Sequence, residues 1–204
     1  ILNFYRYCPQ TAKIVALTDG SGTIYDPNGL NLKRLKELFE SAKAIAYYPP
    51  EELTDEGFLL LKHKRRYPFA HIQETLCYKK VLGKGVEEWL SGSDANHLLR
   101  YNVHQTKADL FVPAGGRPKT LNEANITDYL DEMGIATSKA IVEGANLYLT
   151  PAARRYLEER GVLIIKDSSA NKGGVICSSF EVLCGLTLNE EIFLQKKPLL
   201  VKEI

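Results

Sequence analysis

The sequence predicts an α/β fold in which a doubly wound, mainly parallel sheet carries helices on both faces. Short apolar runs with the composition of buried strands occupy residues 12–18, 108–112, 140–143 and 162–165. Each run ends in small or polar residues, and segments of helical periodicity lie between the runs. Such alternation is typical of parallel sheets, because parallel neighbours need a long crossover that is usually a helix.

The first strand is followed by a turn and an amphipathic helix. Residues 12–18, rich in Ile, Val and Leu, break into the small and polar residues 19–22, and a second turn signal follows at residues 25–29. Over residues 30–44, leucine and phenylalanine recur at helical spacing among lysines and glutamates. This pattern predicts a helix that buries one face.

The middle third of the chain is polar, aromatic and less regular. Pro49-Pro50 before two glutamates indicates a helix start, residues 59–61 fit either a strand or a helix, and residues 83–101 favour another helix. We therefore expect a helical insertion, with loops, at about residues 49–105 that decorates the sheet.

The last hundred residues return to a clear rhythm of strands and helices. Helical periodicity covers residues 121–133, 151–160 and 175–186. Thr150 is the expected cap of the second of these helices, with proline at its first position. Each helix follows one of the three later strands, as a parallel sheet requires.

Composition bounds the class of protein. With 204 residues and 45% apolar content, one sizeable core is expected, in a single domain spanning residues 1–204. A net charge of +1 and apolar runs far shorter than the roughly 20 residues of a membrane span predict no nucleic-acid or membrane partner. Scattered cysteines and histidines predict reduced thiols and no metal site. Because Met133 is the only methionine, we expect a piece of a longer protein.

Small and polar residues with ligand-binding chemistry follow the predicted strands. The carboxyl ends of parallel strands share one edge of a sheet, where ligands bind. A carboxylate there can accept hydrogen bonds from ribose hydroxyls, glycine and alanine let a flat ligand approach, and asparagine offers donors and an acceptor. Each residue type is also common in ordinary turns, so the prediction depends on their shared placement. The residues are Asp19, Gly20, Ala114, Gly115, Asn146 and Asn171.

A helix start follows the last strand. Gly173-Gly174 allows backbone amides to face the crevice, where an anion is favoured, and Val175 and Ser178 share one helix face. The glycine-rich phosphate loop GxGxxG is absent from the sequence. Spacing alone therefore predicts a truncated, doubly wound nucleotide-binding fold.

Four runs of the sequence match motifs of a known family. They span residues 18–27, 108–118, 141–146 and 166–175. The runs resemble the cofactor domain of glutamate dehydrogenases, in particular the large, NAD-specific class, and the polar middle is similar to extra material of that class. The resemblance implies a Rossmann-like NAD-binding domain of a larger chain, with the N-terminal strand and the glycine loop missing.

The resemblance implies oxidative deamination of L-glutamate to 2-oxoglutarate and ammonia, with hydride transfer to NAD. Asp19, with Gly20 beside it, would lie near the adenosine ribose. Ala114 and Gly115 would line the cofactor crevice, and Asn146 would lie by the nicotinamide.

The resemblance also implies a substrate site. Asn171 would lie near both the nicotinamide and the substrate, and Val175 and Ser178 would hold the substrate side chain, with Ser178 bonding its terminal carboxylate. The catalytic lysine and the proton-handling aspartate of the family belong to a separate upstream substrate domain, so no catalytic residue is expected in this chain. The segment alone is then expected to be inactive and to hold the pyrophosphate weakly.

Two alternatives stay open. The first is a dehydrogenase of an apolar amino acid such as leucine or phenylalanine, which would not need a carboxylate partner at Ser178. The second is a non-catalytic regulatory or scaffolding module that binds a nucleotide. Preference for NAD over NADP follows from the resemblance alone, as do the expected homo-oligomer, the missing substrate domain as partner, and a location in the cytoplasm or, in a eukaryote, the mitochondrial matrix.

Overall fold

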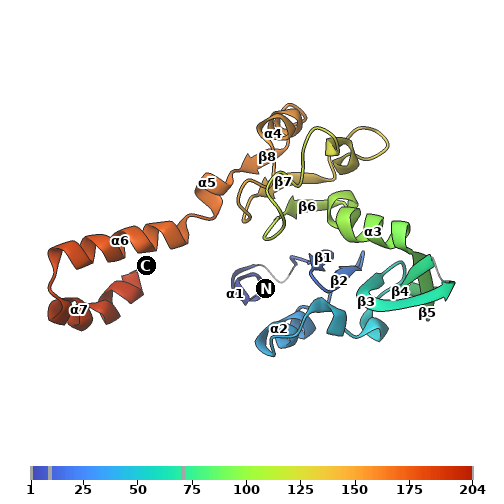
Figure 1. The fold of residues 1–204 in the computed structure, drawn as a ribbon, viewed down its shortest axis with the longest axis horizontal. Helices are drawn as coiled ribbons and strands as arrows, with labels where there is room; N and C mark the ends of the chain where they lie inside the picture. Colours follow the sequence, from blue (N-terminus) through green and yellow to red (C-terminus); the bar gives the residue numbers. More distant parts are fainter. Residues whose placement is uncertain (1, 9–10, 70–71, 204) are drawn as a thin grey trace. The chain divides into compact units, whose positions relative to one another are not determined.

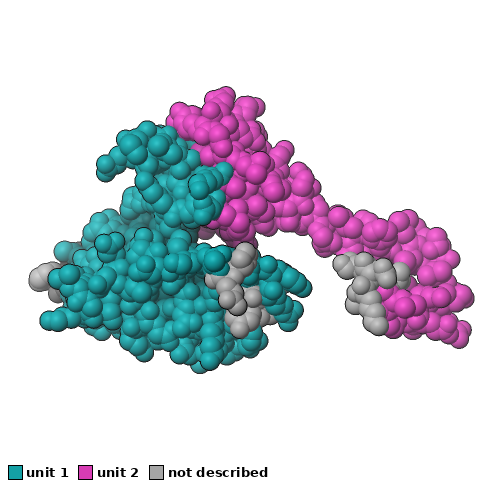
Figure 2. Space-filling model, turned by 180° about the vertical axis from the view of Figure 1, so that it is seen from behind, with its two compact units in different colours: residues 1–109, 124–139 teal, residues 110–123, 140–204 magenta. Residues whose placement is uncertain are grey.

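The computed structural model describes residues 2–8, 11–69 and 72–203. The chain forms two compact units, one of residues 1–109 and 124–139 and the other of residues 110–123 and 140–204 (Figure 2). Both units contain helices and strands (Figure 1), which confirms the predicted α/β class.

The first unit is built on a five-stranded antiparallel sheet whose strands pair in chain order. The register sets Leu17 opposite Ile24 and Ile24 opposite Leu59, so these side chains form one row of the core. The strands are β1 (Ala16–Asp19), β2 (Gly22–Tyr25), β3 (Phe58–Phe69), β4 (Ile72–Val81) and β5 (Lys84–Ser91). The helices are α1 (Leu2–Tyr7), α2 (Leu32–Glu40), α3 (Gly92–Gln105) and the 3-10 helices η1 (Ile45–Tyr47), η2 (Pro50–Glu52) and η3 (Ile126–Tyr129).

The first predicted strand belongs to this antiparallel sheet, which corrects its expected place in a parallel one. Gly20 and Ser21 turn β1 directly into β2. Two turn residues can join only antiparallel neighbours, because a parallel pair needs a crossover of roughly a dozen residues. Gly22 is required by packing, since an added Cβ would collide with the backbone oxygen of Leu60.

The expected helical insertion at about residues 49–105 is wrong for much of that segment, where β3, β4 and β5 pair as neighbouring antiparallel strands. Leu82 and Gly83 connect β4 to β5, and their φ angles are 51° and 75°. Positive φ at both central residues is the geometry of a type I′ hairpin turn. Glycine is common at such positions but leucine is not, so only one of the two turn residues indicated a hairpin turn in the sequence.

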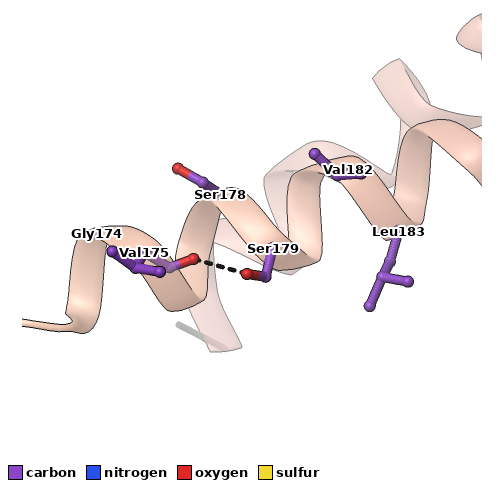
Figure 3. Close-up of a pocket in the computed structure, with 6 residues that line it drawn as sticks. All are labelled: Gly174, Val175, Ser178, Ser179, Val182 and Leu183. Carbon is purple, nitrogen blue, oxygen red and sulfur yellow. Dashed lines mark hydrogen bonds between the residues drawn. The ribbon is translucent and has the colours of Figure 1, made fainter. Parts of the chain in front are cut away.

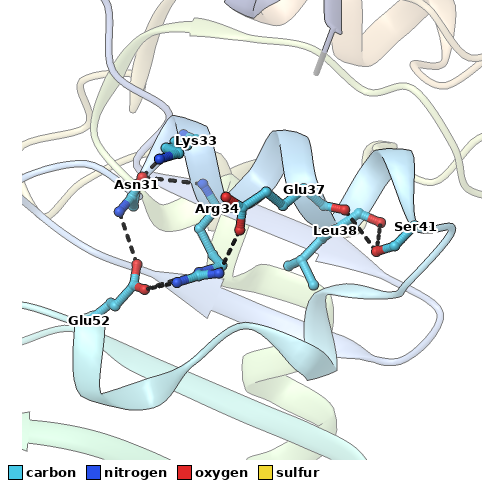
Figure 4. A network of polar contacts seen from close by, with 7 residues as sticks. All are labelled: Asn31, Lys33, Arg34, Glu37, Leu38, Ser41 and Glu52. Carbon is cyan, nitrogen blue, oxygen red and sulfur yellow. Dashed lines mark hydrogen bonds and ion pairs between the residues drawn. The ribbon is translucent and has the colours of Figure 1, made fainter.

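The amphipathic helix expected at residues 30–44 is confirmed as α2, and a polar network fixes its start. The side-chain oxygen of Asn31 caps the helix by accepting hydrogen bonds from N–H groups of the first turn. The Asn31 amide and the Arg34 guanidinium also donate to the Glu52 carboxylate, each at 3.0 Å (Figure 4). The network therefore ties α2 to the 3-10 helix η2, which contains Glu52.

A three-stranded sheet in the order β6-β7-β8 underlies the later part of the chain. Its strands are β6 (Ala108–Phe111), β7 (Ser138–Val142) and β8 (Leu163–Ile165), and the helices after them are α4 (Pro151–Glu158), α5 (Asp167–Ala170), α6 (Gly173–Thr187) and α7 (Glu190–Glu203). Strands β7 and β8 are parallel, with Ile141 opposite Ile164. The predicted parallel pairing of these strands is confirmed, and α4 is the crossover that it requires.

The start of α4 also follows the prediction. Thr150 is the cap, and its hydroxyl accepts a hydrogen bond from the Ala153 N–H, while Pro151 occupies the first turn. Ala153 and Leu157 are buried on the same face of α4. Capping and amphipathic spacing therefore specify this helix locally.

Residues 121–133 do not form the predicted helix, and only η3 forms in this stretch. Asp131 accepts hydrogen bonds from the N–H groups of Met133 and Ile135, each at 3.0 Å. Short polar side chains of this kind compete with a helix for the backbone donors. Local hydrogen bonds to Asp131 therefore favour a turn over the helix that the apolar spacing predicted.

Helices α6 and α7 carry uncovered apolar side chains. The helix expected at residues 175–186 is confirmed as α6, but none of its residues is buried. Phe180 and Leu186 are exposed, as is Leu194 on α7. Within the part of the chain that the structure describes, no helix is both long enough and apolar enough to cross a membrane.

Candidate functional site

Three connections meet at the carboxyl ends of β6, β7 and β8. After β6, the Pro113 carbonyl accepts a hydrogen bond from the Ala145 N–H, which follows β7, at 2.7 Å. After β8, the Asn171 side chain donates to the Gly144 carbonyl at 3.3 Å. The structure therefore brings the last three predicted strand ends together at one edge, where parallel sheets bind ligands.

Two asparagine side chains contact each other at this edge. Nδ2 of Asn171 donates to Oδ1 of Asn146 at 2.7 Å. Because the Asn146 oxygen is engaged, its Nδ2 donors remain for other groups, and Asn146 is exposed. Oδ1 of Asn171 is buried and has no hydrogen-bond partner in the described parts of the chain. A buried acceptor without a donor is uncommon and is often completed by a ligand or a water molecule.

The connection after β6 leaves its main chain open on one side. Ala114 and Gly115 are exposed, and a Cβ added to Gly115 would meet nothing within 4 Å. On the other side packing is close, since a Cβ added to Gly144 would lie 3.4 Å from the Pro113 oxygen. A flat ligand can therefore approach the main chain at Ala114 and Gly115 without meeting a long side chain.

Glu143 anchors the connection after β7, a role that our reading of the sequence missed. Its carboxylate is fully buried, with one oxygen accepting from the Leu149 N–H and the other paired to Arg154, each at 3.0 Å. A buried carboxylate needs such partners, because an unpaired charge in the interior is very unfavourable. The acidic last residue of the predicted strand 140–143 was the available signal.

Asp167 lies two residues after the end of β8 and was also missed as a functional candidate. It is buried, and its carboxylate accepts from the N–H groups of Leu147 and Ser168 at 2.9 and 2.8 Å. The Leu147 hydrogen bond is the largest of the causes that lower the pKa of Asp167 below its usual value. The carboxylate form is therefore held by the backbone of the connection that carries Asn146.

Val175 and Ser178 lie on the exposed surface of α6 (Figure 3). They line a shallow hollow together with four other residues of the same helix, Gly174, Ser179, Val182 and Leu183. The Ser179 hydroxyl donates to the Val175 carbonyl at 2.9 Å, so this serine is turned back onto its own helix. The hollow combines apolar side chains with the Ser178 hydroxyl, which suits a partly apolar ligand with a polar end.

Asp19 and Gly20 lie in the hairpin turn between β1 and β2 rather than after a parallel strand. The Asp19 carboxylate accepts from the Ser21 N–H at 2.7 Å, the Ser21 hydroxyl at 2.6 Å and the Ile45 N–H at 3.0 Å. These bonds give Asp19 the role of a turn aspartate. The predicted convergence of four parallel strand ends therefore lacks its first member, and the binding role of Asp19 and Gly20 stays a prediction.

The described residues contain no candidate metal centre. Across residues 2–8, 11–69 and 72–203, no three His, Cys, Asp or Glu side chains are grouped so that they could hold a metal ion. The chemistry at the strand ends is that of neutral amides, open backbone and a helix start. Such groups recognise polar organic ligands by hydrogen bonding.

Comparisons with known proteins give consistent matches. A probable NAD-specific glutamate dehydrogenase of Schizosaccharomyces pombe is 39% identical over 181 residues, which are 89% of this chain and 15% of that protein. Glutamate dehydrogenase 2 of Dictyostelium discoideum is 38% identical over 184 residues, 89% of this chain and 16% of that protein. A crystal structure of Plasmodium falciparum glutamate dehydrogenase aligns with 90% of this chain over 31% of its own length, at 16% identity and a TM-score of 0.48.

The family assignment rests on the sequence itself. The chain spans only 15% and 16% of the length of the two curated relatives named above. The sequence model of the glutamate/leucine/phenylalanine/valine dehydrogenases nevertheless matches residues 5–196, which is most of the chain. The chain therefore belongs to the glutamate/leucine/phenylalanine/valine dehydrogenase family.

Proposed function

We propose that this chain supplies part of the cofactor-binding region of an NAD-dependent glutamate dehydrogenase. The longer protein would oxidise L-glutamate to 2-oxoglutarate and ammonia. The observation that carries the proposal is the meeting of Ala114, Asn146 and Asn171 at the carboxyl ends of a sheet with parallel β7 and β8. The names of the curated relatives support glutamate and NAD over other substrates and cofactors of the family.

The groups present at the strand ends fit a nicotinamide nucleotide. NAD, when bound, would accept the hydride that leaves the α-carbon of the amino acid. Ala114 and Gly115 would border the flat nicotinamide, because both are exposed and the space beside Gly115 is open. Asn146 would donate from Nδ2 to the carboxamide oxygen, since its own oxygen already accepts from Asn171.

The substrate side chain would lie against α6. Val175 would contact its methylene groups, and the Ser178 hydroxyl would donate to its terminal carboxylate. A dehydrogenase of leucine or phenylalanine is the second candidate, because the hollow on α6 is lined mostly by apolar groups. A hydrogen-bonding hydroxyl favours the acidic substrate, since an apolar side chain would leave it without a partner.

Turnover by the longer protein tests these two candidates. The measurement is NAD reduction with L-glutamate, L-leucine, L-phenylalanine and L-valine, and with NADP in place of NAD. We expect a preference for glutamate and NAD, and Ser178→Ala is expected to raise KM for glutamate by about tenfold through loss of one hydrogen bond to a charged group. A higher kcat/KM for leucine or phenylalanine than for glutamate would select the second candidate.

A matched pair of variants tests the strand-end site itself. Asn146→Ala removes the exposed amide and is expected to weaken NAD binding, whereas Asn125→Ala removes an amide from the polypeptide segment before η3 and should leave NAD binding unchanged. Equal affinity of both variants for NAD would contradict the assignment of Asn146. Binding without any amino-acid oxidation by the longer protein would instead support a regulatory or scaffolding module.

The remaining sequence-based expectations belong to the same proposal. The catalytic lysine would be supplied by a substrate domain outside this chain, so the 204-residue chain alone should not reduce NAD with glutamate. Assembly of the longer protein into a homo-oligomer, and its location in the cytoplasm or mitochondrial matrix, stay predictions. Size-exclusion chromatography with light scattering and fractionation of the source cells would test them.

A further inference from the structure

Asp167 links the two asparagines of the site through separate groups. Its carboxylate accepts a hydrogen bond from the N–H of Leu147, the residue directly after Asn146, at 2.9 Å. Its main-chain carbonyl accepts from the N–H of Asn171 at 3.3 Å. One buried residue therefore bonds to the backbone beside Asn146 and to the backbone of Asn171.

The backbone at Leu147 is held in an unfavourable conformation. Its φ is 52°, in the left-handed region that residues with a side chain rarely occupy. Burial of the side chain does not explain this conformation, because Leu147 is 58% exposed. Two hydrogen bonds are available to hold it, one from Leu147 N–H to Asp167 and one from Lys119 N–H to the Leu147 carbonyl at 2.7 Å.

The conformation of Leu147 determines where the preceding side chain points. Asn146 is connected to Leu147 by one peptide plane, so a change of φ at Leu147 reorients the main chain that carries the Asn146 amide. The bond between Asn171 Nδ2 and Asn146 Oδ1, at 2.7 Å, has little tolerance for such a movement.

We propose that Asp167 is the positioning residue of this site: by holding Leu147 in its left-handed conformation, it keeps the Asn146 and Asn171 amides in contact and the Asn146 donors directed at the ligand. The inference rests on the proposed function, since the ligand is NAD. Asp167 would act on the cofactor site through the backbone at Leu147, without touching the cofactor itself.

The test uses the longer protein and two substitutions. Asp167→Asn keeps the shape of the side chain but leaves a single, neutral acceptor oxygen for the N–H groups of Leu147 and Ser168, so the hydrogen bond that holds Leu147 is weakened. With that bond weakened, Leu147 can leave its unfavourable conformation, and KM for NAD is expected to rise by about tenfold. Leu147→Gly removes the conformational penalty, because glycine occupies positive φ as readily as negative φ.

Rescue distinguishes positioning from general damage to the fold. We expect the double variant D167N/L147G to recover most of the NAD affinity that D167N alone has lost. A purely structural defect would reduce the fraction of active enzyme, and therefore kcat per total protein, while KM stayed unchanged. Asp109→Asn is the charge-matched control, because the Asp109 carboxylate is exposed and pairs with the equally exposed Lys139.

Crystal structures of the same variants provide a readout that does not depend on catalysis. The distance from Asn171 Nδ2 to Asn146 Oδ1 should exceed hydrogen-bonding range in D167N and return to it in D167N/L147G. An unchanged distance in D167N, an unchanged KM, or a raised KM that L147G does not lower would each overturn the inference. Absence of NAD-dependent glutamate oxidation in the native protein would overturn the proposed function, and the crystallographic distances would still decide the role of Asp167.

Discussion

Lowering the pH is expected to destabilise the first unit through one buried histidine. His104, near the end of α3, is 1% exposed, and its ring lies near those of Tyr101 and Tyr129. Burial lowers the pKa of His104 from 6.5 to about 4, against a smaller opposing effect of the Asp128 carboxylate. The folded unit therefore holds a neutral imidazole at pH values where the unfolded chain binds a proton.

The sign and size of the effect follow from this difference in proton binding. Above pH 6.5, His104 is neutral in both the folded and the unfolded state, so its protonation does not affect stability. Between pH 6.5 and 4, His104 binds a proton in the unfolded state but not in the folded state, so the free energy of unfolding falls as the pH is lowered. With these two pKa values, lowering the pH from about 7 to about 5 should reduce the free energy of unfolding by about 2 kcal/mol.

Urea unfolding followed by fluorescence measures this loss. Trp89, the only tryptophan of the chain, lies in β5 and reports on the first unit. His104→Phe keeps an aromatic ring at the site but removes the titrating group. Its free energy of unfolding should therefore lack the loss of about 2 kcal/mol that His104 causes in the native chain when the pH falls from about 7 to about 5. His63→Gln is the control, because it removes an exposed histidine and leaves the buried imidazole in place.

A specific result would refute this reasoning. If the native chain and H104F lose the same free energy of unfolding between pH 7 and pH 5, then His104 does not carry the linkage. A titration of the His104 ring followed by NMR that gave a midpoint above its ordinary value would lead to the same conclusion, because burial would then not be the dominant influence.

Three further perturbations test other parts of the structure. Burial raises the pKa of Cys77 to about 12, so its thiol should react with a disulfide reagent at pH 8 only after unfolding, as counted by thiol release. Gly22→Ala should cost about 3 kcal/mol in urea unfolding, because the added Cβ meets a carbonyl of β3, whereas Gly85→Ala in open space should cost under about 1 kcal/mol. Glu143→Ala should cost roughly 3 kcal/mol, since it leaves the Arg154 charge largely buried; a loss equal to that of a surface substitution would contradict a buried ion pair.

The part of the fold that the sequence predicted well is encoded over short distances. Strands β7 and β8 and helix α4 each appear where apolar runs, a threonine cap and a proline indicated them. A helix between two strands strongly favours parallel pairing, because a parallel crossover needs about a dozen or more residues and is usually a helix. The meeting of Asn146 and Asn171 then followed from topology, without knowledge of any side-chain contact.

The first unit was not predictable in the same way. An apolar run such as residues 12–18 is compatible with either a parallel or an antiparallel neighbour, and the choice depends on which segment pairs with it. The turn after Asp19 is short enough for a hairpin, but its sequence was interpreted through a family motif expected in a parallel sheet. In β3, five consecutive basic or histidine residues concealed the strand, because they suggest a solvated face without strand alternation.

Three carboxylates show why residue type alone does not reveal the structural role of an acid near a strand end. Asp19, Glu143 and Asp167 each lie at the end of a strand or within two residues after it, and the sequence suggested a ligand contact only for Asp19. In the structure all three accept hydrogen bonds from backbone N–H groups of the connections that they anchor. A carboxylate at a strand end satisfies several backbone donors at once, which a neutral side chain cannot do as strongly. In this chain the acids therefore shape the connections, and the ligand contacts that we propose fall to the exposed Asn146 amide and the open backbone that those connections present.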